Sequence, residues 1–202
     1  MKAARSTAAL SLLLLIAGLL AGCAVPADAE RPAAAAPSVS AAPSITAAPA
    51  DPTDAAWAQL MTPMNEQAVA LLSLAGQRAG DPRVRRWAAG LRTAQNGELD
   101  RLRPLLARMG LPDTNVHEGH EMPGMVTERV LEQARAVEGR AFDHLLTARI
   151  RDHLRQSAQV SRSETESGTR SDAKRLATAL VTARKAELAE LDLLPDPSGS
   201  AG

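Results

Sequence analysis

Cysteine and aromatic residues are scarce in this chain of 202 residues, and their scarcity excludes several fold classes. A single cysteine cannot form an intramolecular disulfide, so the folded part must be held together by its core. With no Tyr, one Phe and two Trp, an aromatic-dependent β-sandwich is not expected. Ala, Leu, Arg and Glu are abundant instead, and these residues favour helices.

An excess of positive charge is also missing. The chain has 23 basic and 23 acidic residues. Residues 1–22 contain Lys2 and Arg5 and no acid, so without them 21 basic residues stand against 23 acidic ones, a net charge near −2. That balance gives no reason to expect nucleic-acid binding.

Sequence signatures of catalysis are absent as well. The chain contains neither a Gly-x-Ser-x-Gly motif nor a Gly-rich loop that would hold phosphates. Its one thiol belongs to Cys23, which has another predicted role. We therefore expect a protein that is not an enzyme.

The N-terminus is typical of an export signal. Lys2 and Arg5 precede an apolar run over residues 8–20, which is too short for a transmembrane helix. The segment ends in Leu-Ala-Gly-Cys at 20–23, which resembles a bacterial lipobox, in which the cysteine is lipidated and becomes the first mature residue. We predict a signal peptide over 1–22 and a lipoprotein anchored through Cys23 to the extracytoplasmic face of the cell membrane. The alternative is an ordinary signal peptide with an incidental cysteine.

A low-complexity segment separates this anchor from the rest of the chain. Residues 24–52 contain 12 Ala, 6 Pro and 3 Ser, and they cannot bury enough apolar surface to offset the entropy lost on ordering. We predict a disordered tether over 23–52, a folded domain over 53–195 and a disordered tail over 196–202.

The predicted domain contains two copies of one pattern. Asp143 lies 89 positions after Asp54, and the same offset holds throughout both copies. The other matching pairs are Gln67 and Gln156, Arg86 and Arg175, Ala88 and Ala177, Leu91 and Leu180, Thr93 and Thr182, Ala94 and Ala183, Glu98 and Glu187, Leu99 and Leu188, and Leu102 and Leu191. We predict a duplicated helical hairpin, with repeats over about 53–110 and 141–195 and a connector over 111–140.

Apolar residues at three- and four-residue steps predict the helices. The main stripes run from Trp57 to Ala75, from Val84 to Met109, from Phe142 to Val160 and from Leu176 to Leu194, with a short helix over 127–137. The first helix is expected to begin near Thr53 or Asp54 and to end at Gly80, and the polar stretch 161–169 is expected to fray. Each hairpin alone would expose its apolar face to water. We therefore predict an all-α, antiparallel four-helix bundle.

Three motifs resemble those of a bacterial family of domains of unknown function, number 305 in its series. They are Met-Pro-Gly-Met at 122–125, Phe142-Asp143 at the start of the third main helix, and Gln-x-x-Glu at 95–98 with a partial copy at 184–187. The resemblance covers about residues 53–194 and implies a ferritin-like four-helix fold.

The same resemblance implies metal chemistry. In that family the first helix of each repeat typically carries Met-x-x-His-His, with the histidines pointing into the bundle. Some members look like surface or periplasmic metal-handling proteins, with copper the usual suggestion. At the matching positions this chain has Met64-Asn65 and His153-Leu154, so one of the four histidines is present.

Several polar side chains are expected inside the bundle. The interior set is Met64, Gln95, Glu98, His153, Arg184 and Glu187. A buried carboxylate is costly unless it is paired or bound to a metal, so His153, Glu98 and Glu187 are one candidate metal site. We favour a buried polar network of Gln95, Glu98, His153, Arg184 and Glu187, because the Arg184 cation repels a metal ion and neutralises a carboxylate.

The connector contains a second candidate metal site, formed by His117, His120, Met122 and Met125. Imidazole and thioether groups suit copper, with methionine favouring the cuprous ion, and this spacing can wrap a single ion. The alternative is a plain loop, in which the methionines pack over the bundle and the histidines are solvated.

These observations leave three functional hypotheses. The first is a membrane-anchored lipoprotein that binds copper or another soft metal ion weakly. The second is a metal-free structural or protein-interaction module whose partner the sequence does not identify. The third is a redox or di-iron activity at the interior glutamates.

Overall fold

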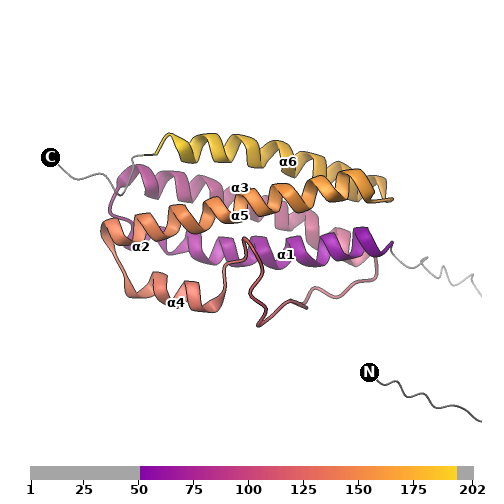
Figure 1. The fold of residues 1–202 in the computed structure, drawn as a ribbon, viewed down its shortest axis with the longest axis horizontal. Coiled ribbons are helices and arrows are strands. Elements are labelled where there is room, and N and C mark those ends of the chain that lie inside the picture. The colour runs from indigo at the N-terminus through magenta and orange to yellow at the C-terminus, as the bar shows by residue number, and fades with distance from the viewer. Residues whose placement is uncertain (1–50, 195–202) are drawn as a thin grey trace, which may run out of the picture. The chain divides into compact units, whose positions relative to one another are not determined.

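The computed structural model describes residues 51–194, which form six helices and no strand (Figure 1). The helices are α1 (Pro52–Ser73), α2 (Ala75–Arg78), α3 (Pro82–Arg108), α4 (Glu128–Ala136), α5 (Gly139–Ser167) and α6 (Ser171–Asp192). The predicted all-α class is therefore confirmed. The predicted signal peptide, Cys23, nearly all of the predicted tether and the tail lie outside the described residues. Within 51–194, no helix is both long enough and apolar enough to cross a bilayer.

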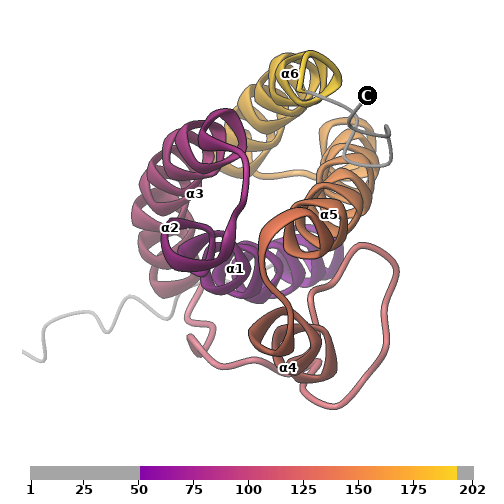
Figure 2. The same cartoon turned by 90° about the vertical axis from the view of Figure 1, so that its left-hand side faces the viewer.

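Four long helices lie side by side to form a bundle, and the short helix α4 lies outside them (Figures 1 and 2). Helices α1 and α3 pack together as one hairpin, and α5 and α6 pack together as the other. Helix α1 also packs against α5, which joins the two hairpins. The first helix ends at Ser73, earlier than the predicted Gly80. After a break at Leu74, the short helix α2 follows.

The first helix begins before the predicted position. The Asp51 carboxylate accepts a hydrogen bond from the Thr53 backbone N–H at 2.9 Å, and Pro52 occupies the first helical position, where its missing N–H costs nothing. Neither Thr53 nor Asp54 is the cap. Asp54 is instead completely buried in the first turn, where it makes a long-range contact.

The core divides into two apolar clusters separated by a polar layer. One cluster surrounds Phe142, Leu71 and Leu91, and the other surrounds Met61, Leu105 and Leu180. Between them along the helices lie the buried polar residues Asn65 on α1, Gln95 and Glu98 on α3, His153 and Ser157 on α5, and Arg184 and Glu187 on α6. The four long helices therefore enclose one continuous polar layer near the middle of the bundle.

The second half of α5 does not fray, contrary to the sequence prediction. The helix continues to Ser167, and Ser161 and Glu164 within it are buried. The Trp57 indole N–H on α1 donates a hydrogen bond to the Ser161 hydroxyl at 3.3 Å. The polar residues of this stretch are therefore internal contacts of the bundle, which a hydrophobicity pattern does not reveal.

Each hairpin fastens the turn of the other through a buried aspartate. The backbone N–H groups of Gly80 and Asp81, in the turn before α3, donate to the Asp143 carboxylate at 3.1 and 2.9 Å. The N–H groups of the turn 169–170, before α6, donate to the Asp54 carboxylate, each at 3.1 Å. The offset of 89 positions relates both the aspartates and the turns that they bind. We call these contacts the Asp143 clasp and the Asp54 clasp.

Replacing Asp143 with Ala should lower the free energy of unfolding by roughly 1.5–3 kcal/mol. The change removes two charge-assisted hydrogen bonds and leaves two partly buried N–H groups without acceptors. Urea denaturation followed by circular dichroism measures the loss. Asp152→Ala is the matched control, because Asp152 is exposed on the same helix and should change stability by less than about 0.5 kcal/mol. Equal denaturation midpoints for the two variants would contradict the clasp.

Candidate functional site

Arg184 is the centre of the polar layer, and it is completely buried. Its guanidinium donates to Glu98 at 2.5 and 3.0 Å and to Glu187 at 2.7 Å. Its Nε donates to the Ser157 hydroxyl at 2.7 Å, and Nη2 lies 3.4 Å from the Asn65 amide oxygen. The donors of the guanidinium are thus directed at four side chains from all four long helices.

The charges in this layer compensate one another. Burial would lower the pKa of Arg184, but the adjacent Glu98 and Glu187 carboxylates outweigh burial and raise it, so the side chain stays a cation. Burial raises the pKa of Glu187, with Arg184 acting in the opposite direction. The Asn65 amide donates a further hydrogen bond to Glu98 at 2.6 Å. Glu98 therefore has donors from two helices besides its own.

His153 belongs to a second part of the layer. Its Nε2 lies 3.0 Å from the Gln95 amide nitrogen. Burial, assisted by the nearby Arg184 cation, lowers the pKa of His153 to about 3, so the imidazole is neutral at physiological pH. Its Nδ1 and the Gln95 Oε1 are buried without a hydrogen-bond partner. Because the neutral ring has a single N–H, one of its two nitrogens remains an acceptor.

The interior arrangement does not suit a metal ion. Glu98 and Glu187 direct their carboxylates at Arg184, whereas His153 faces Gln95. Among residues 51–194, no three His, Cys, Asp or Glu side chains are placed to hold a metal together. Met64, which also belongs to the predicted interior set, is buried in an apolar cluster.

Two residues of this network have weak sequence signals. Asn65 stands where the implied family motif has a histidine, and the repeat offset pairs it with the apolar Leu154. Ser157 faces inward on α5 at helical spacing from His153, but serine is common on solvated faces too. Sequence reasoning missed both residues as Arg184 partners, because which side chains meet across the bundle depends on how the hairpins pack.

The connector candidates lie in two consecutive tight turns. The His120 N–H donates to the His117 carbonyl at 3.1 Å, and the Met125 N–H donates to the Met122 carbonyl at 3.1 Å. The third residue of each turn is a glycine with positive φ, which is 79° at Gly119 and 71° at Gly124. This is the backbone of a type II turn, which brings its first and fourth residues close together. Each turn therefore pairs two side chains of the same kind, imidazoles in one and thioethers in the other.

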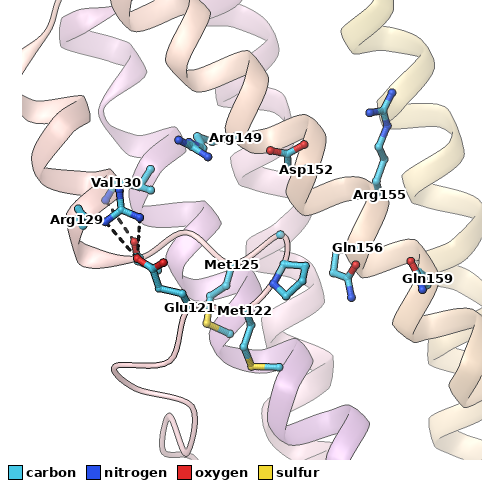
Figure 3. A pocket seen from close by; sticks show the side chains of 13 residues that line it. Glu121, Met122, Met125, Arg129, Val130, Arg149, Asp152, Arg155, Gln156 and Gln159 are labelled. Atoms are coloured by element: carbon cyan, nitrogen blue, oxygen red, sulfur yellow. Dashed lines mark hydrogen bonds and ion pairs between the residues drawn. The ribbon is translucent and has the colours of Figure 1, made fainter.

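Two hollows lie next to these turns, and Met125 lines both of them. A hollow of about 480 Å³ is lined by His117, His120 and Met125, together with Gln67 of α1. A second hollow of about 440 Å³ is lined by Met122 and Met125 and by residues of α5 (Figure 3). Met122 packs on the apolar cluster that contains the nearly buried Met125. Met125 therefore lies between the imidazole side and the thioether side of the connector.

The methionine turn is seated directly on α5. A Cβ at Gly124 would lie 2.4 Å from the Gln156 Cβ and 2.9 Å from the Asp152 carbonyl, so no side chain fits there. The backbone of Gly124 also raises the pKa of the buried His153, against the larger lowering by burial and by Arg184. On the other side of the turn, Glu121 pairs with Arg129 at 2.7 Å (Figure 3). The turn is thus held against α5 on one side and linked to α4 on the other.

The histidine turn is more accessible. His120 is exposed and His117 is half-buried, and the Asn115 side chain accepts a hydrogen bond from the His117 backbone N–H at 3.0 Å. No ion pair or hydrogen bond is recorded for either imidazole ring in the described part of the chain. Both rings are therefore available to an external ligand.

Comparison with known proteins identifies relatives of the whole bundle. A family model described as "Domain of unknown function (DUF305)" matches residues 54–194. A crystal structure of a DUF305 protein from Streptomyces coelicolor is similar, with a TM-score of 0.64 and 24% identity, over 74% of this chain and 96% of that one. A DUF305 fragment from Deinococcus radiodurans gives a TM-score of 0.63 and 18% identity, over 72% and 96%. Comparison with curated proteins gives no significant match.

Proposed function

This chain belongs to the DUF305 family, and we propose that it is a lipoprotein on the extracytoplasmic face of a membrane that binds copper or a similar soft metal ion through its connector. The observation that carries this proposal is the pair of turns, one with two imidazoles and the other with two thioethers. Met125 lines the hollows next to both turns.

The proposed location is supported by the N-terminal sequence and by one relative. Residues 1–22 have the pattern of a secretory signal and end directly before Cys23, in the position that lipidation requires. The Streptomyces coelicolor relative is described as a "putative secreted protein". A protein exported in this way meets metal ions outside the cytoplasm, where an accessible binding loop is useful.

The proposed ligands are chosen by chemistry as well as by placement. Thioether sulfur is a soft ligand that favours the cuprous ion, and imidazole binds both cuprous and cupric ions. His120 is exposed and His117 is half-buried, whereas Met122 and Met125 lie against the bundle. An ion would thus be taken up at the histidine turn and held against the methionine turn. Weak binding is expected, because the accessible rings of His117 and His120 must be ordered when the ion arrives.

A metal-free interaction module is the second candidate function. It is favoured by the polar layer, in which Asn65, a partner of Arg184, stands where the family motif has an inward-pointing histidine. We propose binding rather than catalysis in either case, because Glu98, Arg184 and Glu187 are buried and paired with one another.

Calorimetric titration with cuprous and cupric ions tests the proposal. The full chain with Cys23→Ser is used, so that its one thiol does not bind the metal. Micromolar binding that is lost in His117→Ala/His120→Ala is the expected result. His144→Ala is the matched control, because His144 is exposed on α5 outside the connector, and it should bind like the parent.

The other outcomes separate the candidates. Binding that survives the double substitution moves the site away from the histidine turn and contradicts the proposed ligands. An absence of binding to either ion would favour the metal-free interaction module.

A further inference from the structure

The Asp54 clasp has a second carboxyl group beside it, that of Glu164. This glutamate lies in the last turns of α5 with 1% of its surface exposed, and neither carboxyl oxygen has a hydrogen-bond donor. Its side chain folds back beneath Gly168, where a Cβ would lie 2.3 Å from Oε1. Glycine at 168 therefore makes room for a carboxyl group that the surrounding structure does not neutralise with a donor.

The Asp54 clasp lies next to this carboxyl, because the turn that it binds, 169–170, directly follows Gly168. The Glu164 and Asp54 side chains are placed to hydrogen-bond to each other. Two carboxylates have only acceptors, so this contact needs a proton on one of them. Asp54 already accepts from the backbone N–H groups of the turn 169–170 and from the Thr169 hydroxyl at 2.8 Å, which favours its ionised form. The proton therefore belongs on Glu164.

The charges around Glu164 act in the same direction. Burial, and next the adjacent Asp54, raise the pKa of Glu164 to about 8, with a smaller contribution from Asp51. Lys174 of α6 acts against this increase and lowers the pKa of Glu164, whereas Arg170 pairs with Asp172 at 3.0 Å. Arg108 of α3 also faces Asp172, at 3.3 Å. For Asp54, burial would raise the pKa, but the hydrogen bonds from Glu164 and the turn outweigh burial and lower it.

The repeat provides an internal comparison. The residue 89 positions before Glu164 is Ala75, which is also buried. The Asp143 clasp thus binds its turn in the same way as the Asp54 clasp, with an alanine at the position that corresponds to the second carboxyl. Of the two clasps, therefore, only the Asp54 clasp has a second buried acid beside its aspartate.

We propose that Asp54 and Glu164 form a proton-operated latch, in which a proton held between the two carboxyls keeps the α5–α6 turn fastened to the first turn of α1. Loss of this proton leaves two adjacent buried carboxylates and loosens this end of the bundle, while the Asp143 clasp stays closed. The latched end is the end at which the chain enters α1 from the predicted tether.

The direction of the pH effect follows from where the proton binds more tightly. The closed latch holds the Glu164 proton more tightly than the open one, so its stability is greatest below the ordinary glutamate pKa and falls as the pH rises to about 8. Within that range, each pH unit lowers the ratio of closed to open latch by up to about tenfold. Asp54 acts oppositely, since its contribution is present at neutral pH and is lost as the pH falls through its lowered pKa.

Amide hydrogen exchange of the full chain, followed by NMR between pH 5 and pH 9, tests the latch. Protection factors of the Thr169 and Arg170 amides are compared with those of Gly80 and Asp81, which report the Asp143 clasp in the same sample. We expect the first pair to lose protection relative to the second by up to about tenfold per pH unit, and the loss to level off above about pH 8.

Two glutamate substitutions separate the latch from a general effect of pH. In Glu164→Gln the amide donates to Asp54 at every pH, so the relative protection should not change with pH. Glu166→Gln is the matched control, because Glu166 is exposed two residues further along, and it should behave like the parent. The same pH dependence in Glu164→Gln, or equal behaviour of the two clasps in the parent, would overturn the proposal.

A direct titration avoids dependence on the folding of these variants. Carbon NMR of the glutamate carboxyl groups in the unsubstituted chain should show one group that titrates near pH 8. If every glutamate titrates between about pH 3 and pH 6, no carboxyl retains its proton at neutral pH and the latch does not exist.

Discussion

Replacing Arg184 with Met should lower the free energy of unfolding by roughly 3–5 kcal/mol at neutral pH, because Glu98 and Glu187 would be left buried without their cation. This is a large part of the stability of a typical domain, which is about 5–15 kcal/mol. Denaturation with guanidinium chloride, followed by circular dichroism, measures the loss. The loss should be smaller at pH 5 than at pH 7, since protonation of a glutamate removes one of the two unpaired charges.

Two further variants identify the cause of that loss. Arg184→Met combined with Glu98→Gln and Glu187→Gln should recover most of the stability, because no buried charge remains. Lys185→Met changes a neighbouring exposed cation and should shift stability by less than about 0.5 kcal/mol. If Arg184→Met is no less stable than Lys185→Met, the guanidinium does not hold the polar layer together.

Phe142→Ala should cost a comparable roughly 3–5 kcal/mol, through an apolar mechanism. Phe142 is the one phenylalanine of the chain, and it is completely buried in the first turn of α5 within the cluster that contains Leu71 and Leu91. Truncation removes the buried ring and leaves a cavity between the hairpins. Trp87 packs against the same cluster, so its fluorescence follows the unfolding transition directly.

The controls for Phe142 distinguish lost packing from lost helix. Phe142→Leu keeps most of the apolar volume and should cost about 1.5 kcal/mol or less. His144→Ala, two residues along the same helix and exposed, should leave the midpoint nearly unchanged. Equal losses for Phe142→Ala and Phe142→Leu would show that the cavity is not the source of the effect.

The sequence predicted the helices where one signal dominated. Periodic apolar residues with a Pro or Gly boundary gave α3 and α6 to within a few residues. The prediction failed at the end of α5, where Ser161 and Glu164 are inward, since periodicity reads polar residues as solvated. It also missed the Asp51 cap, because three potential capping residues, Asp51, Thr53 and Asp54, stand close together around the start of the helix.

The candidate sites were predictable in composition but not in arrangement. The 89-residue offset placed Glu98, Arg184 and Glu187 at inward positions, and a buried cation next to buried acids leads directly to their pairing. The offset could not place Asn65 or Glu164, which stand opposite Leu154 and Ala75 and so break the repeat. The sequence predicted which residue types of the connector could be ligands. It did not predict that the histidines lie in one turn and the methionines in the next, because that depends on the backbone conformation.

The reciprocal clasps have a consequence for chain continuity. Each hairpin carries one aspartate and one turn, and each satisfies its partner hairpin rather than itself. Two separate hairpins could therefore make the same clasp contacts with each other. The connector keeps the hairpins close together, but the clasps fix their alignment. A chain cut in the exposed stretch around Glu118 should therefore stay assembled as two fragments. The connector is thus an insertion between two hairpins that bind each other. Its sequence can therefore vary, and acquire a binding site, without loss of the fold.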